Sequence, residues 1–180
     1  MSPLVQRLKV APPSDFFYSP TTPSTDGLTP IPTGPYFFYG TLSDPSLLSE
    51  ILDLSKNPEL KPAYLVGYRC MMWGQYPALM DAPGMIVKGV VYHVCTQEDG
   101  EKLATYETNS YRVEACRIRY FDDKEPSDNL GYTFKFAGNV NDLEEGDFDL
   151  TAWLSRIGRE TAVDGPMVAK KESASCREQT

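Results

Sequence analysis

The apolar positions along the chain follow two periods, and each period predicts one kind of element. Five runs of aromatic and β-branched residues have the composition of buried strands: 36–39, 64–73, 85–94, 111–121 and 130–136. Apolar stripes at helical spacing follow Pro45, Thr96 and Asp149 and predict three helices. Strand-rich stretches broken by single helices predict a mixed α+β domain with a curled sheet.

Composition divides the chain into three parts. Residues 1–34 are rich in Pro, Ser and Thr, a composition that cannot form a core, and they are predicted to be an N-terminal arm. Residues 35–160 carry the periodic pattern and predict one domain, which the length of 180 residues allows. Residues 161–180 lose the periodicity and predict a polar C-terminal tail.

One connection in the pattern has a defined local chemistry. Gly40 breaks the aromatic strand at 36–39, and Ser43-Asp44-Pro45 has the form of a helix start, with a capping side chain before a proline. The strand is therefore expected to enter a helix through a tight Gly-Thr-Leu turn. Free N–H groups and the positive helix end would then face one spot, which suits a carboxylate or a developing oxyanion. An ordinary structural connection explains the same residues equally well.

A second turn is expected inside the strand-rich region. Asp81-Ala82-Pro83-Gly84 has turn chemistry, so the sequence predicts that the strand at 85–94 begins only after it.

Charge and cysteine content exclude several classes of function. The formal charge of −8 argues against a nucleic-acid partner or an anionic membrane surface, since both require clustered Lys and Arg. No apolar run approaches the roughly 20 residues of a membrane span. The four cysteines are widely spaced, which predicts reduced thiols and a cytoplasmic location. His93 is the only histidine, so a histidine-based metal site is not predicted.

Glu107 is the most informative single residue. Counted from Leu103, positions i+3 and i+4 are Tyr106 and Glu107, so Glu107 projects close to the inward stripe of the predicted helix. A carboxylate on an apolar face loses hydration, a setting that suits a general base at neutral pH. In the alternative interpretation the helix frays at this point and Glu107 reaches solvent.

Five blocks stand in a fixed order between about residues 35 and 136: Tyr39-Gly40-Thr41-Leu42, Tyr76-Pro77-Ala78-Leu79, Gly89-Val90-Val91-Tyr92, Leu103-Ala104-Thr105-Tyr106-Glu107 with Tyr111 after it, and Gly131-Tyr132-Thr133-Phe134. In this order they resemble the γ-glutamylcyclotransferase-like family, including its avirulence-induced-gene-like plant and fungal branch. Three departures concern the substrate. Thr108 stands where the family commonly has Gly, Ser43 where it often has a basic residue, and Arg112 lies one place earlier than the family's arginine.

The resemblance implies a curled mixed β-sheet or small barrel with flanking helices, and an enzyme that needs no cofactor or metal. Family members convert a γ-glutamyl compound to 5-oxoproline and a free amine, so the expected partner is a small-molecule substrate. Glu107 would be the catalytic acid/base. Backbone N–H groups of Tyr39, Gly40, Thr41 and Leu42 would hold a substrate oxygen, and Tyr111 would shape the pocket.

Two other hypotheses remain open from the sequence. The first is an enzyme of the same fold whose acid/base chemistry acts on a different small molecule. The second is a non-catalytic small-molecule-binding domain, against which Glu107 argues because a pure binder has little use for an inward carboxylate.

Overall fold

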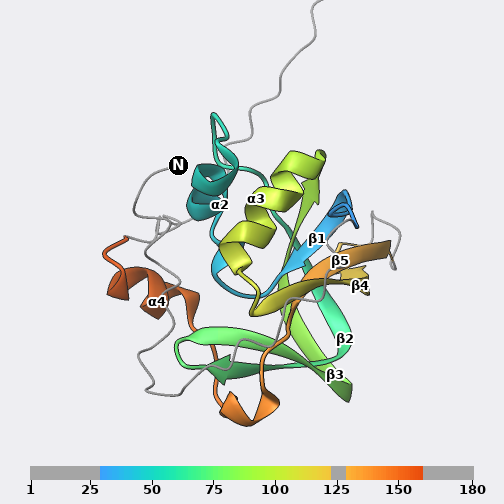
Figure 1. Ribbon diagram of the computed structural model, residues 1–180, viewed down its shortest axis with the longest axis vertical. Helices are drawn as coiled ribbons and strands as arrows, with labels where there is room; N and C mark the ends of the chain where they lie inside the picture. Colours follow the sequence, from blue (N-terminus) through green and yellow to red (C-terminus); the bar gives the residue numbers. More distant parts are fainter. Residues whose placement is uncertain (1–28, 123–128, 160–180) are drawn as a thin grey trace, which may run out of the picture. The chain divides into compact units, whose positions relative to one another are not determined.

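The computed structural model describes residues 29–122 and 129–159 (Figure 1). The chain divides into two compact units, residues 1–150 and 151–180, which are described separately. The elements of the first unit, in chain order, are β1 (Gly34–Phe38), the 3-10 turn η1 (Thr41–Ser43), α2 (Pro45–Leu52), β2 (Lys61–Trp73), β3 (Tyr76–Val94), α3 (Gln97–Glu107), β4 (Tyr111–Tyr120), β5 (Asn129–Phe136) and the 3-10 turn η2 (Val140–Asp142).

The strands form a closed barrel in the order β1-β3-β2-β4-β5. β1 is antiparallel to β3 and parallel to β5, and its pairing with β5 closes the barrel. At this seam Phe37 lies opposite Thr133, and the Thr133 hydroxyl donates a hydrogen bond of 3.0 Å to the Phe37 carbonyl. The α+β class and the small barrel that the sequence predicts are therefore confirmed.

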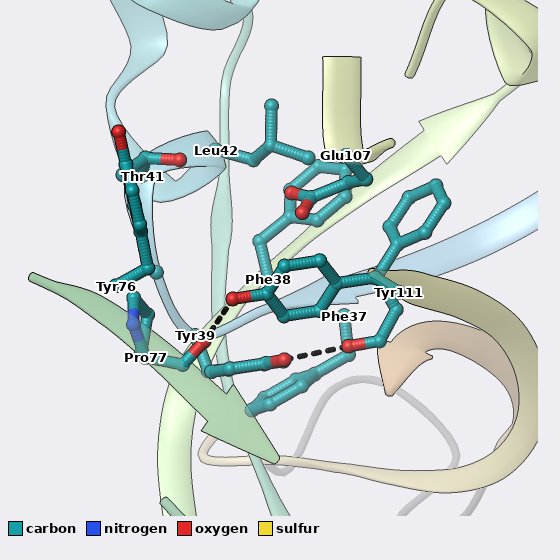
Figure 2. Close-up of a pocket in the computed structure, with 11 residues that line it drawn as sticks. Phe37, Phe38, Tyr39, Thr41, Leu42, Tyr76, Pro77, Glu107 and Tyr111 are labelled. Carbon is teal, nitrogen blue, oxygen red and sulfur yellow. Dashed lines mark hydrogen bonds between the residues drawn. The ribbon is translucent and has the colours of Figure 1, made fainter. Parts of the chain in front are cut away.

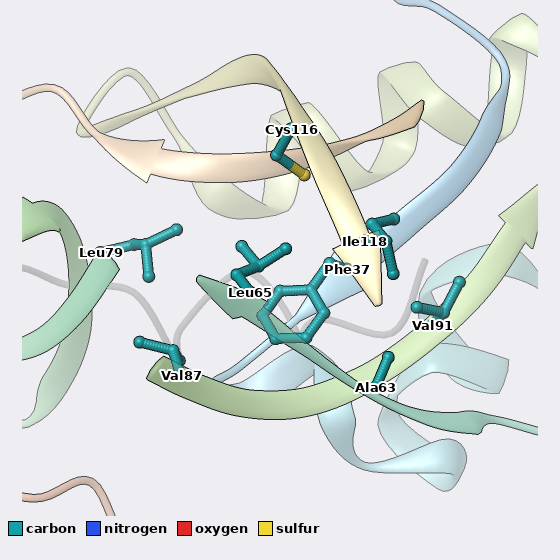
Figure 3. Close-up of a cluster of buried hydrophobic side chains, with 8 residues drawn as sticks. All are labelled: Phe37, Ala63, Leu65, Leu79, Val87, Val91, Cys116 and Ile118. Carbon is teal, nitrogen blue, oxygen red and sulfur yellow. The ribbon is translucent and has the colours of Figure 1, made fainter. Parts of the chain in front are cut away.

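A cluster of buried side chains from β1, β2, β3 and β4 packs together in the core (Figure 3): Phe37, Ala63, Leu65, Leu79, Val87, Val91, Cys116 and Ile118. Burying each large member stabilises the fold by about 1.5–3 kcal/mol. Burial raises the pKa of the Cys116 thiol to about 12, so this cysteine behaves as a small protonated apolar residue. Cys95, by contrast, lies just beyond β3 and is exposed.

The predicted strand start at residue 85 is wrong, because β3 already begins at Tyr76. Asp81 pairs with Tyr68 of β2, and Ile86 pairs with Val66, so the ladder resumes on both sides of the predicted turn. The residues of the predicted turn form an irregularity of the strand opposite Gly67, and the strand does not end there. Pairing with β2 holds the residues before and after the irregularity in place. The outcome is a 19-residue strand that extends from the barrel into a long β2–β3 hairpin.

The two α-helices α2 and α3, in the described part of this unit, begin where their capping residues predict. The Asp44 carboxylate accepts a 2.7 Å hydrogen bond from the Leu47 N–H, and Pro45 is the first residue of α2. The Thr96 hydroxyl accepts from the Asp99 N–H at 3.1 Å and caps α3. α2 and α3 lie side by side (Figure 1). They bring the segment that follows β1 close to the last turn of α3.

The remaining helix, α4 (Leu150–Arg156), begins at the boundary of the two units. Its Trp153 and Leu154 are buried, as the predicted apolar stripe requires. Residues 1–28 and 160–180 lie outside the described part, so the arm (1–34) and the tail (161–180) stay predictions. No helix in the described ranges is both long enough and apolar enough to cross a membrane.

Candidate active site

One small pocket lies where β1 ends, β3 begins and α3 ends (Figure 2). Its cavity of about 20 Å³ holds roughly one water molecule. The lining residues are Phe37, Phe38, Tyr39, Gly40, Thr41, Leu42, Tyr76, Pro77, Glu107, Tyr111 and Phe134. All six residues that the sequence analysis singled out for the site are among them. Glu107 is the only acidic, basic, histidine or cysteine side chain in this lining.

The turn after β1 supplies one wall of the pocket. Within η1 the Ser43 N–H donates back to the Gly40 carbonyl at 3.0 Å, while the N–H groups of Thr41 and Leu42 come too early in the turn to find an acceptor inside it. The sequence predicted that the following helix also faces this spot. The structure differs, because η1 intervenes, Asp44 occupies the start of α2, and no residue of α2 lines the pocket.

Glu107 is the last residue of α3 and is only 8% exposed. The Thr108 N–H donates to the Ala104 carbonyl at 3.0 Å, which closes the last turn of the helix. This excludes the interpretation in which the helix frays and Glu107 reaches solvent. The carboxylate instead points into the pocket, toward the side where Thr41 and Leu42 lie (Figure 2).

Tyr39 uses its hydroxyl to join strands. It donates to the Phe134 carbonyl of β5 at 2.6 Å and accepts from the Leu79 N–H of β3 at 3.3 Å. Burial and the negative charge of Glu107 raise the pKa of Tyr39 well above its usual value. Tyr39 therefore stays protonated, and its hydroxyl holds the pocket wall in place.

Tyr111 has a similar setting. Its hydroxyl donates to the Pro77 carbonyl at 2.9 Å, linking the start of β4 to the start of β3 (Figure 2). Burial, followed by the charge of Glu107, raises the pKa of Tyr111 far above that of a free tyrosine. Both tyrosines are therefore held neutral, and Glu107 is the only carboxylic acid in this lining.

Two features of the site were not visible in the sequence pattern. The Tyr106 hydroxyl donates to Thr41 Oγ1 at 3.1 Å, so the residue before Glu107 bonds directly to the turn. Tyr76 and Pro77 also line the pocket, although the sequence analysis used them only as part of a recurring block. Helical spacing predicts that Tyr106 lies on the apolar face of the helix, but it does not predict which group the Tyr106 hydroxyl contacts.

Thr108 has an unusual backbone for its residue type. Its φ of 65° and ψ of −179° lie in a region that favours glycine and is costly for a β-branched side chain. This is the position where the resembled family commonly has glycine. The conformation turns the chain sharply from Glu107 toward β4, so the site depends on it.

A larger groove lies next to this pocket and has a different chemistry. Its volume is about 450 Å³, and it shares Tyr111 and Phe134 with the pocket, but no acidic residue lines it. Nor does any group of histidine, cysteine or carboxylate side chains in the described ranges have an arrangement that could hold a metal ion. Acid/base chemistry therefore points to the smaller pocket.

Comparisons with known proteins show the same fold. Two Arabidopsis thaliana proteins of known solution structure are similar in fold. One has 23% identity and a TM-score of 0.53, and the match covers 69% of this chain and 82% of the Arabidopsis chain. The other has 21% identity and a TM-score of 0.52, and the match covers 71% of this chain and 76% of the Arabidopsis chain. An AIG2-like protein from Mus musculus has 14% identity and a TM-score of 0.50, covering 81% and 99%.

No curated protein matches the sequence at a significant level. The family model described as "Gamma-glutamyl cyclotransferase, AIG2-like" matches residues 36–153, which include all of the barrel except the first two residues of β1, and all residues that line the pocket. The chain therefore belongs to the AIG2-like gamma-glutamyl cyclotransferase family.

Proposed function

We propose that the protein is a γ-glutamylcyclotransferase-type enzyme that converts a γ-glutamyl compound to 5-oxoproline and a free amine. The observation that carries the proposal is the placement of Glu107. It is a buried carboxylate, it is the only acid in the pocket lining, and it points toward a turn with N–H groups that have no acceptor inside the turn.

The reaction requires one molecule to fold onto itself. The substrate's α-amine attacks its own γ-carbonyl carbon, so a C–N bond forms and the carbonyl oxygen takes up negative charge. A pocket that holds both ends of the glutamyl group in this shape replaces an unfavourable search by a near-attack geometry. Aromatic side chains such as Phe38 and Tyr111 give the walls the rigidity that this requires.

Glu107 moves the proton in this scheme. Its carboxylate accepts a proton from the attacking α-amine and then delivers it to the nitrogen of the leaving amine as the amide bond breaks. No water is consumed and no redox change occurs, so the step needs no co-reactant. General acid/base transfer of this kind contributes about 10²–10⁴-fold in rate.

The turn stabilises charge in the same scheme. The N–H groups of Thr41 and Leu42 are suited to a substrate oxygen that becomes negative, and each such donor is worth about 10²–10³-fold when it is held in place. The cavity of about 20 Å³ is smaller than a glutamyl group. Substrate binding is therefore expected to move the lining side chains apart.

The decisive experiment is a substrate panel. Purified protein is incubated with γ-glutamyl amino acids, γ-glutamyl amines and glutathione, and released 5-oxoproline is measured. We expect turnover of at least one class. No release from any of them would overturn the proposal and favour the alternative, acid/base chemistry on a different small molecule in the same pocket.

A further inference from the structure

The hydroxyl of Thr41 is buried beside the pocket, and it accepts a hydrogen bond but donates none to the described residues. Thr41 is 4% exposed, and its Oγ1 accepts the hydrogen bond from the Tyr106 hydroxyl at 3.1 Å. A hydroxyl can accept bonds and also donate one proton. Among the described residues, nothing accepts a hydrogen bond from Thr41 Oγ1.

The pocket offers a place for an acceptor of that proton. Thr41 lines the cavity that Glu107 also lines, whereas Tyr106, which donates to the Thr41 oxygen, is not among the lining residues. A buried donor without an acceptor is costly, and an acceptor entering the cavity would remove that cost.

We propose that the Thr41 hydroxyl donates a hydrogen bond to a negatively charged oxygen of the substrate, and that Tyr106 acts as the positioning residue that orients it. The inference rests on the proposed function, because it takes the ligand to be a γ-glutamyl compound or its product 5-oxoproline. In this arrangement the substrate is bound by a side-chain donor as well as by the backbone N–H groups of the turn. The orientation of that donor is set by Tyr106, which lies in α3, the helix that carries Glu107.

The bond between Tyr106 and Thr41 also couples the two halves of the site. Tyr106 precedes Glu107 in α3, and Thr41 begins η1, so one hydrogen bond fixes the helix end relative to the turn. A change in either residue is therefore expected to affect how the substrate is held as well as how stable the fold is.

The test compares Thr41→Val, Thr41→Ser, Tyr106→Phe and the double variant Thr41→Val with Tyr106→Phe. With the best substrate of the panel, Thr41→Val and Tyr106→Phe should each lower kcat/KM about three- to ten-fold, the worth of one hydrogen bond. Thr41→Ser keeps the hydroxyl and should recover most of the loss. The double variant should be no worse than Thr41→Val, because Tyr106 acts through Thr41.

Tyr36→Phe is the matched control. The Tyr36 hydroxyl donates to the Pro32 carbonyl at 2.7 Å, and Tyr36 does not line the pocket. This variant should lower the melting temperature and leave kcat/KM unchanged. A wild-type kcat/KM in Thr41→Val, or losses that multiply in the double variant, would overturn the inference.

The split between kinetic constants identifies which oxygen is bound. A lower kcat at constant KM assigns the bond to the developing oxyanion, and a higher KM at constant kcat assigns it to the carboxylate. Titration with 5-oxoproline, followed by NMR, gives a readout without turnover. 5-Oxoproline keeps the carboxylate and has no oxyanion, so Thr41→Val should weaken its Kd by the same factor if the carboxylate is the bound oxygen. If the wild-type protein binds 5-oxoproline but turns over no substrate, the proposed reaction fails, and a weaker Kd of Thr41→Val then supports the inference by itself. A Kd and a kcat/KM that are both unchanged in Thr41→Val would overturn the inference.

Discussion

A Cβ atom at Gly40 would lie 2.5 Å from Cγ of Pro77, closer than two such carbons can approach. Gly40 follows the end of β1, and Pro77 lies at the start of β3. Both residues line the pocket. This contact holds the turn after β1 against the start of β3. The glycine of the Tyr39–Leu42 block is therefore required by packing, in addition to any role of its N–H group.

Gly40→Ala should destabilise the fold by about 1–3 kcal/mol, because the new methyl group displaces the Pro77 ring and the turn that follows Gly40. Activity should fall together with stability, since the same turn faces Glu107. Chemical denaturation and kcat/KM measure the two effects. Pro77→Ala removes the clashing atom, so adding it to Gly40→Ala should restore part of the lost stability. A double variant that is less stable than Gly40→Ala would show that the contact is not the cause.

Glu107→Gln keeps the size of the side chain and removes its ability to accept a proton. We expect kcat to fall by about 10²–10⁴-fold with the melting temperature nearly unchanged. Glu101→Gln is the matched control, because Glu101 is an exposed acid on the same helix that contacts Gln97. Activity of Glu107→Gln within a few-fold of wild type would refute the proposed proton transfer.

Thr108→Gly should stabilise the protein by about 1 kcal/mol, because glycine adopts the φ of 65° without the steric cost that threonine carries. Thr105→Gly is the control. Thr105 is exposed inside α3, where replacing threonine by glycine should destabilise by about 0.3–0.5 kcal/mol. Urea denaturation of both variants gives the comparison. A Thr108→Gly protein less stable than wild type would mean that the threonine side chain makes contacts that outweigh the strain.

Stability should decline at alkaline pH because of the buried tyrosines. Burial and Glu107 raise the pKa values of Tyr39 and Tyr111 in the folded state. Their contribution is fully present below the pKa of an unfolded tyrosine, about 10, and is lost as the pH rises above it. Tyrosinate absorbance should therefore show some tyrosines ionising only as the circular dichroism of the fold disappears. Ionisation of all 11 tyrosines before any unfolding would contradict this.

Lys135 joins three strands at the barrel wall. Its ammonium group is 2.8 Å from Asp81 Oδ2 and 3.0 Å from Glu114 Oε1, and its side chain is 9% exposed. Burial alone would lower the pKa of Lys135, but the hydrogen bonds to Asp81 and Glu114 outweigh it and raise the pKa. The ammonium therefore remains charged throughout the neutral range.

Lys135→Met should destabilise the protein by about 1–3 kcal/mol, since it removes the cation while its two acidic partners remain. Lys88→Met is the control, because Lys88 is an exposed lysine of β3 and its loss should change stability by less than about 0.5 kcal/mol. Thermal unfolding at neutral pH measures both. Equal effects of the two variants would show that the ion pairs contribute nothing measurable.

Local signals were sufficient for most of the elements. Asp44 before Pro45 predicted the start of α2, and Thr96 predicted the start of α3, because caps and helical periodicity act within a few residues. The prediction of a turn at 81–84 was wrong because the strand there is decided by distant residues. Its residues favour a turn locally, but pairing of Asp81 with Tyr68 and of Ile86 with Val66 decides the strand, and those partners lie in another part of the chain.

The sequence by itself determined the kinds of element and the glycine of the turn, since each follows from a pattern along one segment. It left open whether Glu107 points inward or reaches solvent. Only the tertiary structure decided that Glu107 faces Thr41 and Leu42, that Tyr106 bonds to Thr41, and that η1 separates the pocket from α2. The first two of these relationships join residues more than sixty positions apart. They depend on how the barrel closes between β1 and β5, which brings the end of β1 to the end of α3, and no local pattern encodes that approach.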